Sequence, residues 1–379
     1  MALTDFKAQY DNAYEEIFQK VLVGKSIANL RFEPVLTYGG SVVRMTYNID
    51  GVLVRSVTRG SASTIDTLTD DTETLTVNNE YEAVFHISDG EARQAGNLNP
   101  GEVIGGKVGH EVAQDLDARI LFEVTNANQT FDSGDLTTLI SNTTPFSLTS
   151  TTVPQMATRM PAKLKRGTNQ ILANMCFVID SYAASDLAQY LLGKQFDIVS
   201  YVFKNGDAGE QFAQAQVYIS ENLTGDTTLT VSAVASDIQN GDYLNINGVT
   251  LKFTTSAPAA VGEVSKSATS VGATLLNLKA ALEGPETSVS GQYFAHTSTS
   301  MQILQKLRAA CTATSTTLRI KAKGSGRLTV SETISGGSFN SPFIHCNYGK
   351  KGEIDVVVQD FKPVDMRPTA DRRGTNVFS

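Results

Sequence analysis

The feature that most constrains the fold is a run of apolar residues spaced by four. Its members are Ile104, Val108, Val112, Leu116, Ile120 and Val124. This spacing places them on one face of a helix. Asn99-Pro100 is typical of a helix start. We therefore predict a helix from residue 100 to about residue 126, which would be about 40 Å long.

Three glycines, Gly105, Gly106 and Gly109, lie beside the centre of this apolar stripe. Each weakens a helix by about 1 kcal/mol relative to alanine. We therefore expect them to allow the close approach of another backbone. Lys107 and His110 are expected on the polar flank of the helix.

Two catalytic motifs almost occur in the same stretch. Residues 101–107 have the spacing of a phosphate-binding loop, but Val108 stands where a hydroxyl would bind magnesium. Residues 110–114 begin like a zinc-protease helix, but Gln114 stands where the second histidine is required. We therefore expect a packing role here. We assign no catalytic, cofactor-binding or metal-binding residue, and we expect that the protein is not an enzyme.

Composition excludes several other classes of protein. The 379 residues suffice for two or three domains, and the net charge of −8 argues against a general affinity for nucleic acid. The cysteines Cys176, Cys311 and Cys346 have neither a metal spacing nor a disulfide framework, which suits a reducing compartment. We predict no signal peptide and no membrane span.

The first ninety residues contain a helical and then a β-like pattern. Residues 3–23 predict an amphipathic helix with an aromatic face, which docks either on its own core or on a neighbouring subunit. Residues 41–57 predict a hairpin around Asp50-Gly51.

Residues 56–85 form a Ser/Thr-rich acidic segment. Against the single basic residue Arg59 it carries six acids, namely Asp66, Asp70, Asp71, Glu73, Glu80 and Glu82. It is either a solvated loop or long hairpin, or an arm that extends across another subunit.

Two basic clusters are candidates for accepting the charge of this acidic segment. The first is Arg159, Lys163, Lys165 and Arg166, which we predict to lie in a solvated loop rather than on nucleic acid, because no aromatic residue interleaves them. The second is Arg367, Arg372 and Arg373. We predict that the second cluster contacts Asp66, Asp70, Asp71 and Glu73 of a neighbouring subunit.

The rest of the chain divides by texture. Residues 131–222 predict mixed α/β structure, with a buried strand at 173–179, a helix capped by Asp180 or Ser181, and a helix end at Gly193. Residues 223–341 are rich in Thr, Ser, Ala and Gly and carry nine basic and seven acidic residues. They predict a hairpin at Asn247-Gly248, a helix at 270–284 and a second hairpin around residues 324–326. Because strand-like acidic sequence resumes after residue 341, we predict an inserted β-rich domain.

The order of these elements resembles the major capsid protein of tailed bacteriophages, the Hong Kong phage type of capsid fold. The resemblance rests on the segment TRGSASTIDTLTDDTETLTVNNEYEA, the helix PGEVIGGKVGHEVAQDLDARILFEVTNA, and the phrases ANMCFVIDSYAASDLAQYL and GDAGEQFAQAQVYISENL. It covers most of residues 1–222 and 342–379. The segment NGDYLNINGVTLKF and the later TTLRIKAKGSG resemble a small β-rich module of several phage structural proteins, which sits on the outer surface of capsids.

The resemblance implies an α+β fold with five parts. These are an N-terminal arm (1–40), an extended loop and peripheral domain with a long spine helix (41–130), an axial domain (131–222), an inserted surface domain (223–341) and a return to the capsid core (342–379). Some family members crosslink through a lysine in the extended loop. Residues 27–106 contain no lysine, so this chemistry is excluded for the loop. Family members often end in strands that run back into the peripheral domain.

The implied function is self-assembly through hexamers and pentamers into an icosahedral shell around double-stranded DNA, which is bound without sequence specificity. The implied partners are scaffolding and portal proteins, with a decoration protein as a further candidate and no membrane. The protein would lie in the virion capsid, and in the host cytoplasm during assembly. A tail or tube protein is the alternative, although the long helix argues against it. A secreted adhesin is disfavoured by the lack of a signal sequence.

Overall fold

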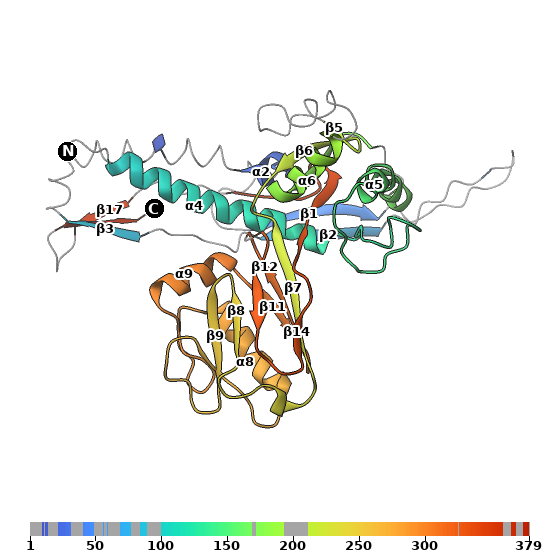
Figure 1. Cartoon of the computed structure of the whole chain (residues 1–379). Helices are drawn as coiled ribbons and strands as arrows, with labels where there is room; N and C mark the ends of the chain where they lie inside the picture. The colour runs from blue at the N-terminus through green and yellow to red at the C-terminus, as the bar shows by residue number, and fades with distance from the viewer. Residues whose placement is uncertain are drawn as a thin grey trace. The chain divides into compact units, whose positions relative to one another are not determined.

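The computed structural model is a mixed helix-and-sheet structure (Figure 1). It describes residues 10, 12–13, 22–31, 41–48, 56, 59, 69–76, 84–88, 100–168, 172–192, 211–324, 326–358, 365–368 and 374–378. The chain divides into two compact units. The first comprises residues 1–13, 29–105 and 355–379, and the second comprises residues 14–28 and 106–354.

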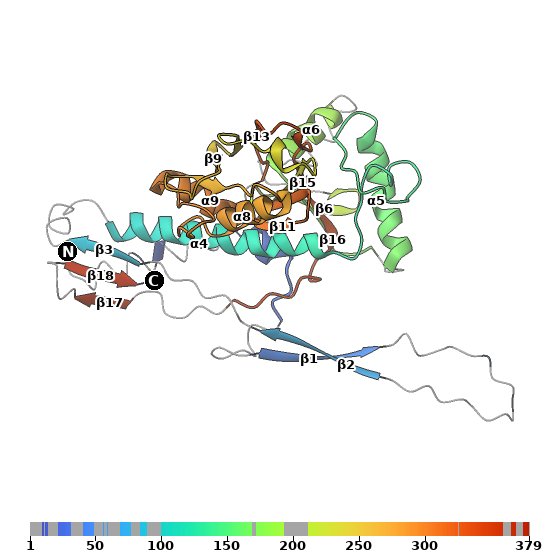
Figure 2. The ribbon, with the colours of Figure 1, turned by 90° about the horizontal axis from the view of Figure 1, so that it is seen from below.

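The first unit contains two small antiparallel sheets (Figure 2). One is a two-stranded ribbon of β1 (Ser41–Asn48) and β2 (Thr69–Thr76). The other has the order β17-β18-β3, with β17 at Asp365–Pro368, β18 at Gly374–Phe378 and β3 at Val84–Ser88. β18, near the end of the chain, therefore pairs with β3, which lies at the end of the acidic segment 56–85 and just after it. The predicted hairpin turn at Asp50-Gly51 and most of the predicted helix 3–23 lie outside the described residues. The short α2 (Val23–Ile27) is described at the end of that helix.

The long helix is confirmed. α4 runs from Pro100 to Phe122 and continues as a 3-10 turn at Glu123–Asn126. The end of the predicted helix is thus a tighter turn, while Asn99, its predicted cap, lies outside the description. Lys107 and His110 are exposed, as predicted for the polar flank.

The buried face of α4 differs from the predicted one. Of the predicted stripe only Ile120 is fully buried, and its other members are half-buried. The closely packed line lies one residue further on and consists of Gly105, Gly109, Ala113, Asp117 and Leu121. Glycine and alanine are buried on this face of α4 because their small size lets a neighbouring backbone approach the helix. A Cβ at Gly105 would lie 2.5 Å from the Tyr10 carbonyl oxygen, which confirms the close approach expected for that glycine.

The predicted α/β segment forms a four-stranded sheet of order β16-β4-β6-β5. The strands are β4 (Met175–Ile179), β5 (Gln211–Phe212), β6 (Ala215–Ile219) and β16 (Asn347–Lys350). β4 is buried throughout and parallel to β6. Asp180 caps α6 (Ser181–Leu192), since its Oδ1 accepts a 2.9 Å hydrogen bond from the Ala183 amide. The predicted strand, cap and helix are therefore confirmed, while Gly193 lies beyond the described residues.

The basic cluster of residues 159–166 is not in a loop. It forms the end of α5 (Thr152–Thr168), which continues through Pro161. The loop prediction was wrong because the helix is stabilised by packing: Val153, Met156 and Met160 lie on one buried face and join the core of the β4 sheet.

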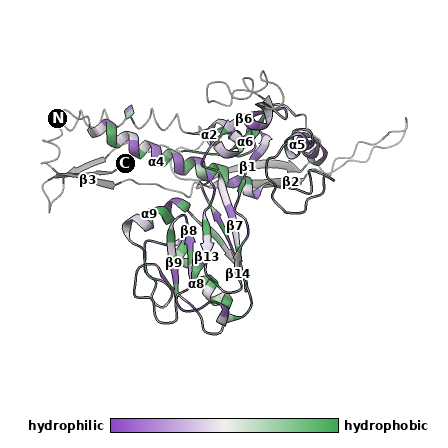
Figure 3. Ribbon diagram, in the orientation of Figure 1, coloured by the Kyte–Doolittle hydropathy of each residue, from purple (hydrophilic) through white to green (hydrophobic). Residues whose placement is uncertain are grey.

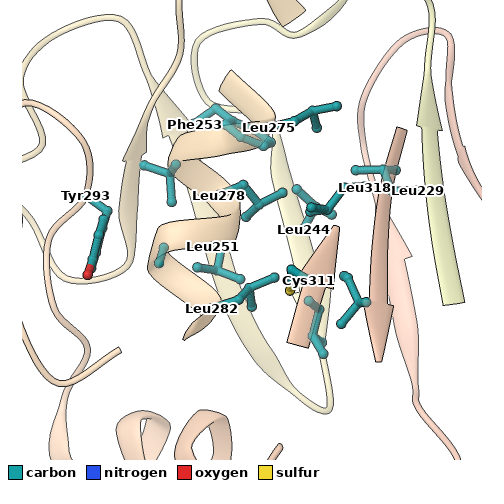
Figure 4. Close-up of a cluster of buried hydrophobic side chains, with 14 of the residues drawn as sticks. Leu229, Leu244, Leu251, Phe253, Leu275, Leu278, Leu282, Tyr293, Cys311 and Leu318 are labelled. Atoms are coloured by element: carbon teal, nitrogen blue, oxygen red, sulfur yellow. The ribbon is translucent and has the colours of Figure 1, made fainter. Parts of the chain in front are cut away.

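Residues 229–334 contribute a separate hydrophobic core, which includes Leu244, Leu251, Phe253, Leu278 and Leu318 (Figure 4). We call residues 223–341 the β-rich module. Its first sheet has the order β10-β9-β8-β13, with β8 at Tyr243–Ile246, β9 at Val249–Thr254, β10 at Glu263–Ser265 and β13 at Val330–Glu332. Hydrophobic and hydrophilic residues alternate along β9 (Figure 3), as a half-buried strand requires.

The second sheet is built on β7 (Thr224–Val231). Its order is β11-β12-β7-β14, with β11 at Ala310–Ala313, β12 at Thr317–Ala322 and β14 at Gly337–Phe339. β15 (Phe343–His345) also pairs with β7. The strand that enters the module and the strand that leaves it are therefore hydrogen-bonded neighbours.

The predicted local structures of the module are confirmed in part. The hairpin at Asn247-Gly248 joins β8 and β9, and both turn residues have positive φ. The helix predicted at 270–284 is confirmed as α8 (Val271–Glu283), with Ser270 as its N-cap and Gly284 as its C-cap. α9 (Ser298–Leu307) was not predicted.

The second predicted hairpin is wrong. β12 pairs with β11 and β7, whereas β13 pairs with β8 in the other sheet. β12 and β13 therefore belong to different sheets. Gly324 serves close packing, since a Cβ there would lie 2.3 Å from the Cβ of Ala118.

A buried carboxylate joins the entering and leaving strands. Asp226 in β7 is fully buried and accepts hydrogen bonds from Arg319 Nη2 at 2.6 Å and from His345 Nε2 at 2.9 Å. Burial by itself would raise the pKa of Asp226, but the hydrogen bonds from His345 and Arg319 outweigh it and lower the pKa.

We expect Asp226→Asn to destabilise the chain at neutral pH, with a difference that shrinks in acid. A carboxyl whose folded pKa is lowered stabilises the fold above its unfolded pKa of about 3.9, and this contribution is lost as the pH falls through the folded value. Denaturant unfolding of both chains from about pH 7 to about pH 3 measures the difference. The exposed Glu286→Gln is the control. A pH-independent difference for D226N would contradict the expectation.

Candidate functional site

The predicted acidic contact residues lie in the β1–β2 ribbon as far as the structure describes them. Asp70, Asp71 and Glu73 are in β2, where their register partners in β1 are Tyr47, Thr46 and Arg44 respectively. Asp66 lies outside the description.

The predicted basic partners lie elsewhere in the same unit. Arg367 is in β17, opposite Asn376, in a sheet that does not include β2. Arg372 and Arg373 lie outside the described residues. A single chain does not test a contact between subunits, so the pairing stays a prediction. Sequence reasoning missed that Arg44 stands opposite Glu73, because Arg44 lies outside the segment whose charges were compared.

The alternative basic cluster is divided between two roles. Arg159 and Lys163 hold the preceding loop: Arg159 Nη1 lies 2.6 Å from the Thr137 carbonyl oxygen, and Lys163 Nζ lies 2.5 Å from the buried carboxylate of Asp135. Lys165 and Arg166 are exposed. Of these four residues, only Lys165 and Arg166 are solvent-exposed, as we predicted for the whole cluster.

A buried carboxylate joins three segments of the second unit. Asp117 of α4 is fully buried and accepts hydrogen bonds from the Gly24 amide at 2.5 Å, the Ser220 hydroxyl at 3.0 Å and Asn222 Nδ2 at 2.9 Å. Burial raises the pKa of Asp117, although these donors oppose the shift. Residues close in sequence to this site, Ile27, Leu121 and Leu223, form a small apolar cluster with Cys176 and Val178.

The β-rich module contacts α4 along a line of charged and aromatic groups, which we call the α4 seam. On the module it comprises Lys306, Arg308, Lys323 and Gly324, and on α4 it comprises Glu111, Asp115, Ala118 and Phe122. Lys306 Nζ lies 3.0 Å from Glu111 Oε1, but both side chains are more than half exposed, so this pair contributes only about 0–1 kcal/mol.

The inner part of the α4 seam is better shielded from solvent. Arg308 forms an ion pair with Asp115, whose side chain is 7% exposed, and Arg119 reaches the same carboxylate at 3.0 Å. Lys323 Nζ lies 4.3 Å from the centroid of the Phe122 ring. Because the carboxylate is desolvated, removing its partners costs more than removing a surface pair.

A second contact fixes the module to the start of α6. Arg327 Nε donates to Asp180 Oδ2 at 3.1 Å, and its guanidinium lies 4.8 Å from the centroid of the Tyr182 ring. Asp180 thus both caps α6 and binds the module. The sequence predicts the cap, but it gives no signal for Arg327, which is 147 residues away.

The described residues support no metal centre and no spanning helix. Within the ranges given above, no group of three or more His, Cys, Asp or Glu side chains is placed to hold a metal ion. Among the same residues, no helix is long and apolar enough to cross a membrane.

Comparison with known proteins gives partial likenesses to phage capsid structures. No family model and no curated protein matches the chain. The mature capsid of bacteriophage PhiM1 is 14% identical with a TM-score of 0.34, over 48% of this chain and 58% of that chain. The capsid structure of cyanophage P-SCSP1u is 13% identical with a TM-score of 0.35, and the match covers 53% of this chain and 63% of that chain. This chain therefore spans less than two thirds of these two. A structure from Mycobacterium phage Che8 is 12% identical with a TM-score of 0.34, and the match covers 84% of this chain and 90% of that chain.

We expect a substitution at Gly324 to disturb the packing of the α4 seam. Gly324 has φ +74°, and a Cβ added there would clash with Ala118. Gly248 has a similar φ of +86°, but a Cβ added there would have no atom within 4 Å. Both Gly→Ala changes cost about 1–3 kcal/mol for the left-handed backbone. We expect G324A to cost about 1–3 kcal/mol more than G248A, because it also overpacks the seam.

Denaturant unfolding measures both glycine variants. Ala118→Gly should recover part of the loss in the G324A background, because it removes the opposing methyl group. Equal costs for G324A and G248A would contradict the close contact.

Proposed function

We propose that this chain is the major capsid protein of a tailed bacteriophage, with the Hong Kong phage type of fold, and that it self-assembles into an icosahedral shell around double-stranded DNA. The observation that carries the proposal is the chain order of its elements. An acidic two-stranded ribbon precedes the long α4, an α/β sheet with α5 and α6 follows, and a β-rich module interrupts that sheet. This is the order on which the sequence resemblance rests.

The place of the module supports an insertion rather than an appended domain. β6 leads into β7 through residues 220–223, and β15 leads into β16, which pairs with β4 of the same sheet. The proposed boundaries therefore remain 131–222 for the axial domain, 223–341 for the inserted domain and 342–379 for the return to the core.

The ribbon supports assembly. A two-stranded ribbon is at best marginally stable alone in water. Apart from Leu75, β2 consists of Thr, Asp and Glu, and its register partners in β1 include Val, Met and Tyr as well as polar residues. We propose that residues 56–85 extend over a neighbouring subunit in hexamers and pentamers. Scaffolding and portal proteins, DNA and a decoration protein are the further proposed partners. A tail-tube role is disfavoured, because such subunits are mainly β whereas α4 has 23 residues.

We expect the purified chain to form closed shells or capsomer-sized rings. Many weak contacts per subunit make assembly favourable even where each contact is weak. Electron microscopy and sedimentation velocity distinguish shells, rings, tubes and monomers. A chain that remains a compact monomer, alone and with its scaffolding partner, would overturn the proposal, and open tubes would favour the tail alternative.

The charge pairing proposed between subunits has its own test. We expect Arg372→Glu with Arg373→Glu to impair assembly at low ionic strength while the monomer stays folded, because the reversed charges repel the acidic ribbon. Asp70→Lys with Asp71→Lys should restore part of it. The matched control is Lys165→Glu with Arg166→Glu, an exposed pair with the same charge change. Unchanged assembly of the first variant by light scattering would place the partner of the ribbon elsewhere.

A further inference from the structure

The loop between η3 and α5 has an unusual surface. Residues 136–158 contain no charged residue, in a chain that is 18% charged. Ile140 is 70% exposed, which is the largest exposed fraction among the large apolar side chains that the structure describes. We call residues 136–146 the Ile140 loop. Depletion of charge around an exposed apolar residue is typical of the centre of a protein interface.

The base of the Ile140 loop is fixed to the core. Phe146 packs edge-on against Phe131, with 5.8 Å between ring centroids. The Ser133 amide donates to the Thr144 carbonyl at 2.9 Å, so the segment that leads into the loop is hydrogen-bonded to the loop's second half. Arg159 of α5 binds the Thr137 carbonyl oxygen at 2.6 Å. Both ends and one side of the loop are therefore held.

The tip of the loop is held by one carboxylate. Asp132, which is 6% exposed, accepts hydrogen bonds from the amides of Gly134 at 3.0 Å, Asn142 at 3.1 Å and Thr143 at 2.9 Å, and from the Ser141 hydroxyl. Burial opposes ionisation of Asp132, but these donors outweigh it and lower its pKa. The residues that follow Ile140 are thereby fixed in one conformation.

The conformation that these bonds enforce is strained. Leu139 has φ +57° and Thr143 has φ +60°, values that cost such residues about 1–3 kcal/mol each. The loop also closes tightly, since a Cβ at Gly134 would lie 2.2 Å from the Ile140 carbonyl oxygen. Strain of this kind persists only where the surroundings enforce it, and here the result is an isoleucine presented to solvent.

We propose that the Ile140 loop is a preformed contact for a second copy of this chain, with Ile140 as its apolar anchor; this rests on the assembly proposed above. A second copy fits because each chain carries a net charge of −8. A loop that carries no charged side chain of its own adds no repulsion between two copies of the same net charge. A rigid loop also loses little conformational entropy on binding.

The test is Ile140→Asp, measured by light scattering and electron microscopy under conditions in which the parent chain assembles. We expect the amount of assembled protein to fall roughly tenfold or more, because the contact would bury an unpaired carboxylate. The matched control is Leu276→Asp on α8, where the parent side chain is 58% exposed. Loss with I140D but not with L276D supports the proposal. Equal loss in both variants, or normal assembly of I140D, overturns it.

Two further observations separate the possible failures. A parent chain that never assembles overturns the proposed function and this contact together, whereas an assembling parent with an assembling I140D overturns the contact alone. If I140D does not fold, as judged by circular dichroism, hydroxyl-radical footprinting of the parent chain decides instead. Ile140 should be protected in assembled protein relative to dissociated protein, and equal labelling would overturn the proposal.

Discussion

The second unit depends on one buried carboxylate, that of Asp117. It binds the Gly24 amide before α4 in the chain and Ser220 and Asn222 after it, so one side chain fixes α2, α4 and the turn that enters the β-rich module. Its raised pKa means that burying the charge opposes folding. Three donors limit that cost. Gly24 can approach because it has no side chain, since a Cβ there would lie 2.9 Å from the Cβ of Ile120 in α4.

The same device recurs throughout the unit. Asp132 organises the Ile140 loop, Asp180 caps α6 and binds Arg327, and Asp226 joins the strands that enter and leave the module. In each case a buried or nearly buried aspartate binds donors from segments that are distant in sequence or from a loop that would otherwise be open. A chain with few charges thus uses several of them as internal connections, because a desolvated carboxylate holds its donors more strongly than a surface one.

This arrangement suits the proposed role as a shell subunit. The β-rich module has its own hydrophobic core, yet it also contacts α4 through Arg308, Lys323 and Gly324 and contacts α6 through Arg327. Contacts at several points restrict movement of the module relative to α4 and α6. We propose that the exposed Ile140 loop and residues 56–85 contact other subunits.

The sequence by itself determined the elements whose signals are local. The period of four predicts α4, Asn247-Gly248 predicts the β8–β9 hairpin, and Asp180 predicts the cap of α6, because each depends on backbone geometry within a few residues. The tertiary structure decided what depends on distant partners. It buried the line of Gly105, Ala113 and Asp117 rather than the apolar stripe, it separated β12 from β13, and it made residues 159–166 part of a helix. Of the predicted contact residues it described only those in β2 and β17. Local pattern fixes which residues form an element. The face that is buried follows from how closely another backbone can approach, and that distance is set by residues far away in the sequence.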